Sequence, residues 1–299
     1  MDLRVLRYFL TVAQEESIVA AAEALHMTQP TLSRQLKELE EELGAQLFVR
    51  GNKAQKLALT DKGQLLRNRA EDLLSLAAKT KQEFLQEEQS VSGTVQIGGG
   101  ETEGMRMVAQ AAKRLREKHS AVSFALYSGN AEDVKERLDK GLLDFGLFIQ
   151  PTNLQKYAVL RLPVTDRWGL LVRSDSPLAA RSQLSAQDLA GIPLLVSSQR
   201  TVLHNLQQWL KLREEQLHIV GRYNLLFNAA LLVEEGVGCA VCLDKLLIGE
   251  HRGLRFVPLL PQLDMGIDLA WRQYHPLSKA AAAFLAEMRS LCVDFEGNN

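Results

Sequence analysis

The stretch SIVAAAEALHMTQPTLSRQLKELEEELGAQLFVR, Ser17 to Arg50, predicts two short helices joined by a tight turn. Ser17 and Thr28 stand ahead of the two helical patterns, and their hydroxyl groups suit N-caps because they can accept a first-turn N–H hydrogen bond. Pro30 falls in the first turn of the second helix, where its missing N–H costs nothing. That helix carries one apolar stripe at three- and four-residue steps, formed by Leu32, Leu36, Leu39 and Leu43.

The first half of the second helix presents polar and basic side chains opposite the stripe. Gln suits adenine, Arg suits guanine and the Thr methyl suits thymine in a DNA major groove. We therefore expect DNA contacts from Gln29, Pro30, Thr31, Ser33, Arg34 and Lys37. Phosphate would repel the glutamates of the far end, Glu38, Glu40, Glu41 and Glu42, so only the first half should enter the groove. An ordinary amphipathic helix pair within an all-helical core is the alternative interpretation.

A short β-capable run follows the second helix. Phe48-Val49-Arg50 leads into GNKAQKLALT, which carries Lys53 and Lys56. A basic hairpin in this place is the wing of a winged helix and can touch the DNA backbone or minor groove. Arg50 and Lys53 therefore join the expected DNA contacts.

The N-terminal sequence resembles the DNA-binding end of LysR-type transcriptional regulators. The matching features are Ala21-Ala22, Leu25, Gln29-Pro30, Leu32-Ser33-Arg34, Leu39-Glu40, Leu43-Gly44, Leu47-Phe48, Arg50, Leu59-Thr60 and Gly63. The resemblance implies that the helix beginning at Gln29 reads DNA and that Arg50 to Lys56 form the wing.

The charge of the chain argues against a non-specific nucleic-acid coat protein. The net charge is −1, and the first ninety residues hold twelve Lys and Arg against fourteen Asp and Glu. Phosphate contacts normally dominate DNA affinity, so a locally patterned basic face would bind weakly as a single copy. We therefore expect a homodimer or homotetramer that presents several such faces.

A long helix is predicted from Thr60-Asp61, which suit its cap, to about Glu88. One of its faces carries Leu66, Ala70, Leu73, Ala77 and Phe84. A two-stranded coiled coil would cover this face, and packing within the helix's own domain is the alternative. In LysR-type regulators the corresponding helix pairs two chains, and a linker follows at 89–93.

The remaining two thirds alternate strands with helices. Strands are expected at 94–98, 122–127, 145–149, 168–172, 194–196, 219–223, 240–243 and 267–271, and helices at 103–118, 131–140, 202–216, 225–235 and 277–291. This order favours doubly wound parallel sheets with helices on both faces, in two lobes because of the length. GLLDFGLFI (141–149) and VEEGVGCAV (233–241) are among the phrases that resemble the LysR-type effector domain.

The expected fold class is α/β: an N-terminal winged helix-turn-helix, a long dimerisation helix, and a two-lobed doubly wound effector domain resembling periplasmic binding proteins. The expected domains are residues 1–60, 61–90 and 91–299. The resemblance implies one lobe of 91–162 plus 266–299 and another of 163–265, with crossovers near Pro163 and Pro261.

Ligands of open α/β sheets bind beyond the carboxyl ends of the strands. This rule predicts an effector site from the residues at four strand ends: Gly100, Glu101 and Thr102; Ser128 and Gly129; Gln150, Pro151 and Thr152; and Ser197 and Ser198. Thr102 could cap the following helix and, with backbone N–H groups, hold a small anion. The alternative is that these are ordinary polar residues at strand ends.

The sequence contains no catalytic motif such as Gly-x-Ser-x-Gly or HExxH, and we expect neither an enzyme nor a cofactor. Cys239 and Cys242 form a CxxC in an apolar run, which is typical of buried residues. No second CxxC or His pair completes a metal set. No apolar run approaches the roughly eighteen residues of a membrane span, so we expect a cytoplasmic protein without membrane contact.

The function that the sequence favours is sequence-specific transcriptional regulation in response to a small-molecule effector bound between two lobes. The expected partners are double-stranded promoter DNA, the effector, further copies of the chain and RNA polymerase. The alternative is a small-molecule-binding or enzymatic α/β domain fused to a helical dimerisation module, and a thiol redox sensor is a subcase. The sequence does not identify the effector or the operator, and it does not distinguish an activator from a repressor.

Overall fold

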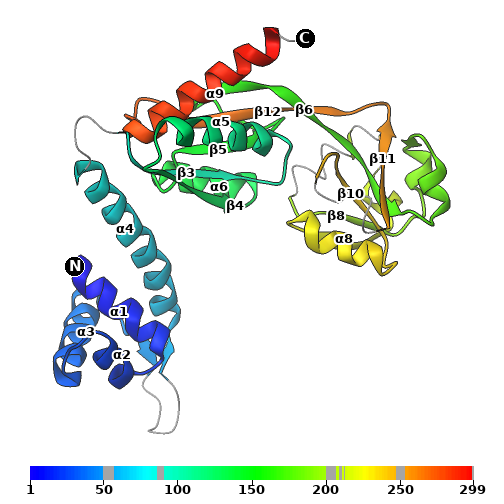
Figure 1. Cartoon of the computed structure of the whole chain (residues 1–299). Coiled ribbons are helices and arrows are strands. Elements are labelled where there is room, and N and C mark those ends of the chain that lie inside the picture. Colours follow the sequence, from blue (N-terminus) through cyan, green and yellow to red (C-terminus); the bar gives the residue numbers. More distant parts are fainter. Residues whose placement is uncertain are drawn as a thin grey trace. The chain divides into compact units, whose positions relative to one another are not determined.

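The computed structural model describes residues 1–49, 57–85, 91–199, 207–208, 211, 213–246 and 253–297. The chain divides into two compact units, Met1–Glu87 and Glu88–Asn299 (Figure 1). Each unit has hydrophobic clusters of its own.

The N-terminal unit is a winged helix-turn-helix followed by a long helix. Its elements are α1 (Leu3–Glu15), α2 (Ile18–Ala24), α3 (Gln29–Leu43), β1 (Phe48–Val49), β2 (Ala58–Leu59) and α4 (Asp61–Leu85). Ser17 caps α2 as expected, because its hydroxyl accepts a hydrogen bond from Ala20 N at 3.3 Å. The rings of Phe9 and Phe48 lie 5.3 Å apart in the core that joins α1 to the hairpin.

The start of α4 is fixed against the segment that precedes the hairpin. Thr60 Oγ1 accepts from Gly63 N at 2.9 Å, which confirms the expected cap, and donates to Gln46 O at 2.7 Å. A Cβ atom on Gly63 would lie 2.1 Å from Leu47 O, so only glycine allows this close approach.

The first lobe of the C-terminal unit is a mixed sheet covered on both faces. Its strands and helices are β3 (Gly93–Gly99), α5 (Gly104–Lys118), β4 (Val122–Ser128), α6 (Ala131–Asp139), β5 (Phe145–Ile149) and the C-terminal α9 (Lys279–Gly297). Strands β4, β3 and β5 are parallel, as expected. Helices α5 and α9 pack in one cluster and α6 in another, on the opposite face (Figure 1).

The second lobe combines strands with 3₁₀ turns and a helix. Its elements are the 3₁₀ turns η1 (Pro177–Ala180), η2 (Gln187–Leu189) and η3 (Glu214–Gln216), strands β7 (Leu184–Ser185), β8 (Leu194–Ser197), β9 (Ile219–Tyr223), β10 (Cys239–Leu243) and β11 (Leu254–Leu260), and helix α8 (Leu226–Glu234). Strands β10, β8 and β9 are parallel. The helix expected at 202–216 lies largely outside the described residues.

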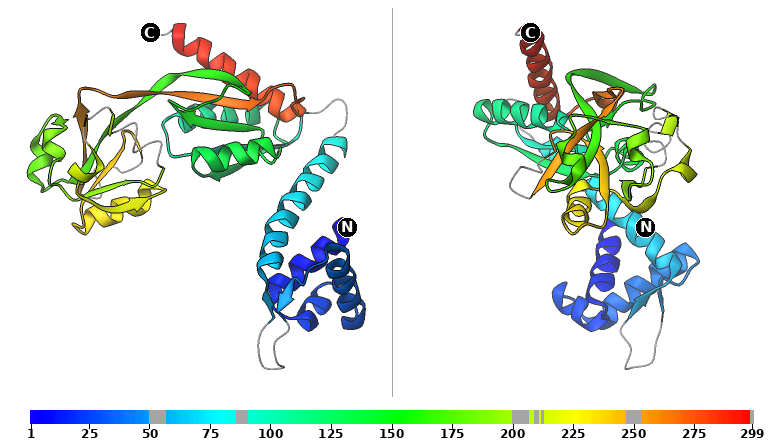
Figure 2. Two further views of the ribbon diagram at one scale, coloured as in Figure 1. Left: turned by 180° about the vertical axis from the view of Figure 1, so that it is seen from behind. Right: turned by 90° about the vertical axis from the view of Figure 1, so that its right-hand side faces the viewer.

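Two long strands run from one lobe to the other, β6 (Tyr157–Arg173) and β12 (Asp264–Arg272) (Figure 2). They pair antiparallel from Tyr157↔Arg272 to Arg167↔Asp264, with a register shift between Gly266 and Ile267. β12 is also antiparallel to β5. The expectation of purely parallel sheets was therefore wrong for these strands, because a strand that leaves one lobe and a strand that returns must run in opposite directions. The first half of β6 and all of β11 were not predicted.

Candidate DNA-reading surface and effector cavity

The N-terminal end of α3 is exposed and polar. Gln29, Pro30, Thr31 and the side chains of Arg34 and Lys37 face solvent, and Ser33 is half-buried. Gln29 Nε2 donates to Ser33 Oγ at 3.2 Å, so these two polar groups lie together. The opposite face buries Leu32, Leu36 and Leu39, while Leu43, the last member of the expected stripe, is 41% exposed.

Thr28 departs from its expected role. It has the extended backbone of an N-cap, but its side chain makes no capping hydrogen bond. Its hydroxyl pairs instead with the hydroxyl of Thr31 at 2.8 Å. The first-turn N–H groups of α3 therefore do not donate a hydrogen bond to the side chain of Thr28.

The glutamates of α3 divide into two kinds. Glu38 lies 3.7 Å from Arg34 and Glu41 lies 3.5 Å from Lys37, so both cations have acidic neighbours one turn away. Glu40 points inward, where its carboxylate accepts hydrogen bonds from Leu47 N (2.7 Å) and Phe48 N (3.4 Å). The expectation that Glu40 belongs to a surface repelled by DNA was therefore wrong, because these two backbone N–H groups hold its carboxylate against the start of the hairpin.

The hairpin is present, with Phe48 opposite Leu59 and Val49 opposite Ala58. Arg50 and Lys53 lie outside the described residues, so the contacts expected of them stay predictions.

Helix α4 packs on its own unit with one part of its apolar surface and exposes another. Leu66 and Ala70 are buried in the N-terminal core, which agrees with the alternative interpretation of this face. Leu65, Leu73, Leu76 and Phe84 are 52%, 38%, 39% and 87% exposed, respectively.

The C-terminal unit contains a cavity of about 490 Å³ between its two lobes. Seven of the expected strand-end residues line it: Gly100, Glu101, Gly129, Gln150, Pro151, Thr152 and Ser197. Two others do not: Ser128 is exposed at the end of β4, and Ser198 is exposed beyond β8. Thr102 is buried outside the cavity.

Several lining residues were missed at the sequence level. They include Phe148, Trp168, Gln199, Gln208, Tyr223, Asn224, Cys242, Leu246, Leu263 and Met265. Trp168 and Met265 come from the crossing strands β6 and β12. A strand-end rule does not find Phe148, Trp168 or Met265, because they lie within strands. Tyr223 ends β9 and Asn224 follows it, so the same rule could have included these two residues.

Thr102 faces the chain's own carboxylate rather than an external anion. Thr102 Oγ1 donates to Asp166 Oδ2 at 2.5 Å, and Glu103 N donates to Asp166 Oδ1 at 3.2 Å. Gly104 N in turn donates to Thr102 Oγ1 at 3.2 Å, so Thr102 does cap α5. The start of α5 is thereby occupied, and the expected anion-binding role of Thr102 was wrong for this arrangement.

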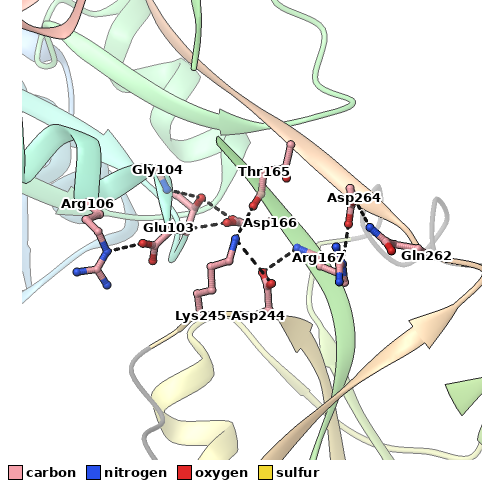
Figure 3. A network of polar contacts seen from close by, with 11 residues as sticks. Glu103, Gly104, Arg106, Thr165, Asp166, Arg167, Asp244, Lys245, Gln262 and Asp264 are labelled. Carbon is pink, nitrogen blue, oxygen red and sulfur yellow. Dashed lines mark hydrogen bonds and ion pairs between the residues drawn. The ribbon is translucent and has the colours of Figure 1, made fainter. Parts of the chain in front are cut away.

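Asp166 belongs to a polar network where β6 passes from lobe to lobe (Figure 3). Burial raises the pKa of Asp166, while the hydrogen bonds from Thr102 and Glu103 lower it. Arg167 N donates to Asp244 Oδ1 at 2.8 Å, and Lys245 Nζ donates to Thr165 O at 3.0 Å. The network thus ties the start of α5 and the end of β10 to the same crossing strand.

Glu101 makes a contact across the cavity. Its carboxylate accepts a short hydrogen bond from the backbone N–H of Leu226, the first residue of α8. Glu101 follows β3 in the first lobe, whereas α8 belongs to the second. This bond therefore joins the two walls of the cavity.

The two cysteines of the CxxC do not face each other in a shared redox or metal site. Cys239 and Cys242 lie three residues apart on β10, so their side chains point to opposite faces, and they pack against different clusters. Burial raises the pKa of both thiols. Neutral buried thiols are poor nucleophiles, which weakens the redox interpretation.

Among the described residues, no group of three or more His, Cys, Asp or Glu side chains could hold a metal ion. In the same residues, no helix is both long and apolar enough to cross a membrane.

Comparisons with known proteins agree along the whole chain. Residues 3–64 match the family model described as bacterial regulatory helix-turn-helix protein, lysR family, and residues 88–293 match the LysR substrate binding domain. The regulator IlvY of Escherichia coli strain K12 is 30% identical over 71% of this chain and 71% of its own. The uncharacterized regulator YvbU of Bacillus subtilis is 26% identical over 97% and 99%.

Solved structures show the same fold. The LysR family regulator CbnR has a TM-score of 0.77 at 18% identity, covering 98% of this chain and 99% of its own. Full-length BenM has a TM-score of 0.57 at 26% identity, covering 99% and 98%. CbnR has also been solved in a complex with its target DNA, with a TM-score of 0.76 to this chain at 18% identity, covering 97% and 99%.

Proposed function

The chain belongs to the LysR family of bacterial transcriptional regulators, and we propose that it reads promoter DNA with two copies of α3 under the control of a small ligand. It is a DNA-binding regulator rather than an enzyme. The observation that carries the proposal is the exposed polar face of α3 above a buried apolar stripe.

The proposed reading residues are those of the first half of α3. Arg34 and Lys37 have side chains that are 71% and 67% exposed, and Gln29 and Thr31 are exposed beside them. An exposed ion pair contributes little stability, so Arg34 can exchange Glu38 for a guanine edge at small cost. Arg50 and Lys53 remain proposed wing contacts.

The proposed assembly is a homodimer or homotetramer in which α4 pairs two chains. Its exposed apolar side chains support this proposal, because large hydrophobic groups in a row on one helix typically pack on a partner. The proposed domains are those of residues 1–60, 61–90 and 91–299, with the lobe boundaries expected from the sequence. We place the protein in the cytoplasm, where promoter DNA and RNA polymerase are its partners.

The proposed effector site is the cavity between the lobes. A ligand there would contact both lobes and so favour one of their arrangements over another, which is how a bound molecule shifts a conformational population. The proposed contacts from the sequence are Gly100, Glu101, Gln150 and Ser197. We add Trp168 from the crossing strand β6 and Tyr223 from the second lobe.

The test is quantitative footprinting of the full-length protein on the DNA upstream of its own gene. Arg34→Ala should weaken site-specific protection about ten- to a hundredfold, since one good base contact contributes about 1–3 kcal/mol of discrimination. Arg67→Ala is the matched control, because it breaks an equivalent i,i+4 pair, with Glu71 at 3.4 Å, on α4 instead of α3. Equal protection by folded Arg34→Ala and wild type would rule out the reading role.

A further inference from the structure

The cavity between the lobes has one distinctive electrostatic feature. Among the lining residues that the structure describes, Glu101 is the one with a charged side chain. The other polar groups are neutral amides and hydroxyls, contributed by Gln150, Thr152, Ser197, Gln199, Gln208, Tyr223 and Asn224. The described wall is therefore apolar and hydrogen-bonding, with a single negative charge.

Glu101 has capacity for a further partner. One carboxylate oxygen accepts the N–H of Leu226, and the second accepts no hydrogen bond from the residues that the structure describes. Each carboxylate oxygen can accept about two hydrogen bonds, so a ligand can bind without displacing Leu226.

The backbone beside Glu101 is held in place. Thr102 and Glu103 both bond to the buried carboxylate of Asp166 on the crossing strand. The chain at Glu101 is thereby anchored, and its carboxylate is held by the N–H of Leu226. A charge held in this way needs little reorganisation to meet a ligand.

We propose that the effector is a small molecule with a protonated amine on an apolar body, and that Glu101 is the counter-ion of that amine. This inference rests on the proposed function, since it assigns the chemical class of the ligand for the same cavity. An ammonium group gains an opposite charge at Glu101, whereas a carboxylate in the same place meets a like charge in a poorly solvated site.

The rest of the cavity suits the apolar body of such a ligand. Phe148, Trp168 and Tyr223 line it together with Leu147, Leu243 and Met265. Aromatic rings attract cations through their faces and contribute apolar contact area, so they favour both the ammonium group and the apolar body of the ligand. A cavity of about 490 Å³ accommodates a small metabolite.

The test uses three probes with one shape and three charges: 3-phenylpropylamine, 3-phenylpropanol and 3-phenylpropionate. Their affinities for the full-length protein are measured by calorimetry at neutral pH. The amine should bind roughly tenfold tighter than the alcohol, the equivalent of about 1.4 kcal/mol, and the carboxylate should bind weakest.

Two variants separate charge from structure. Glu101→Gln keeps an amide oxygen that can accept the N–H of Leu226 but removes the charge, so the preference for the amine should disappear while the affinity for the alcohol stays within about twofold. Glu132→Gln removes an exposed carboxylate from the first turn of α6, outside the cavity, and should leave all three affinities unchanged.

Tighter binding of the carboxylate than of the amine overturns the proposal. So does a preference for the amine that survives in Glu101→Gln, or failure of the amine to bind at millimolar concentration. Footprinting in parallel distinguishes these failures from failure of the proposed function. If site-specific DNA protection is intact, the proposed DNA-binding function holds and only the proposed ligand class is rejected.

Discussion

At the scale of single residues, three carboxylates illustrate how environment assigns a role. Glu40 holds the backbone at the start of the wing hairpin, Asp166 holds the start of α5, and Glu101 faces the cavity. All three are acidic residues in the sequence, without a local pattern that separates them. Their roles follow from the N–H and O–H groups that the fold brings to each one, because an isolated carboxylate would stay in water.

Asp166 should give stability a distinctive pH dependence. Burial raises the pKa of Asp166 above its unfolded value, so its favourable contribution is fully present below the unfolded pKa and is lost as pH rises through the folded pKa. The free energy of unfolding of wild type, relative to Asp166→Asn, should therefore fall between about pH 4 and about pH 7. Urea titrations at both pH values measure this difference.

Asp264→Asn is the control of opposite sign. A hydrogen bond from Arg167 lowers the pKa of Asp264, so its contribution is present above the unfolded pKa and is lost as pH falls. The wild type, relative to Asp264→Asn, should gain stability with rising pH. Equal pH slopes of these two stability differences would contradict the raised pKa of Asp166.

At the scale of elements, α4 serves two structural purposes along one length. Leu66 and Ala70 complete the core of the N-terminal unit, while Leu73, Leu76 and Phe84 remain exposed. The sequence predicts one apolar face for the whole helix, because periodicity reports which residues avoid water and not what covers them. The neighbouring α1 covers only the part of that face within its reach.

The exposed part of α4 can be tested through the mass of the protein in solution. Leu73→Asp combined with Phe84→Asp should shift the mass measured by light scattering to a smaller assembly, because two charges then face each other across the proposed pair of helices. Circular dichroism should be unchanged, since both side chains are exposed in the single chain. Lys81→Asp, an exposed charge change on the same helix, should leave the mass as in wild type; an unchanged mass in the double variant would contradict pairing through α4.

At the scale of the whole molecule, the chain is two units with separate cores. Every buried residue of the N-terminal core lies in Met1–Glu87, and the clusters of the lobes lie in Glu88–Asn299. A core that receives no side chain from the other unit gives cooperative unfolding of its own. The two units should therefore respond separately to core substitutions.

Calorimetry can check this independence with a reciprocal pair of substitutions. Phe9→Ala should destabilise the N-terminal unit by about 3–5 kcal/mol through loss of a fully buried ring, and lower only the transition of that unit. Phe284→Ala, at an equally buried position in the first lobe, should lower only the other transition. A single transition that both substitutions shift together would show that the units unfold as one.

Features that depend on neighbours along the chain could be predicted from the sequence. The cap at Ser17, the helix from Gln29, the strand at 145–149 and the alternation of the lobes all follow from spacings of two to four residues, which local geometry fixes. Features that depend on residues far apart in sequence could be recognised in the folded chain alone. Trp168 and Tyr223 line the cavity, Glu101 meets Leu226, and Asp166 replaces an external anion at α5, because the two crossing strands bring these segments together. No local pattern encodes such a meeting, since the partners stand more than fifty residues apart.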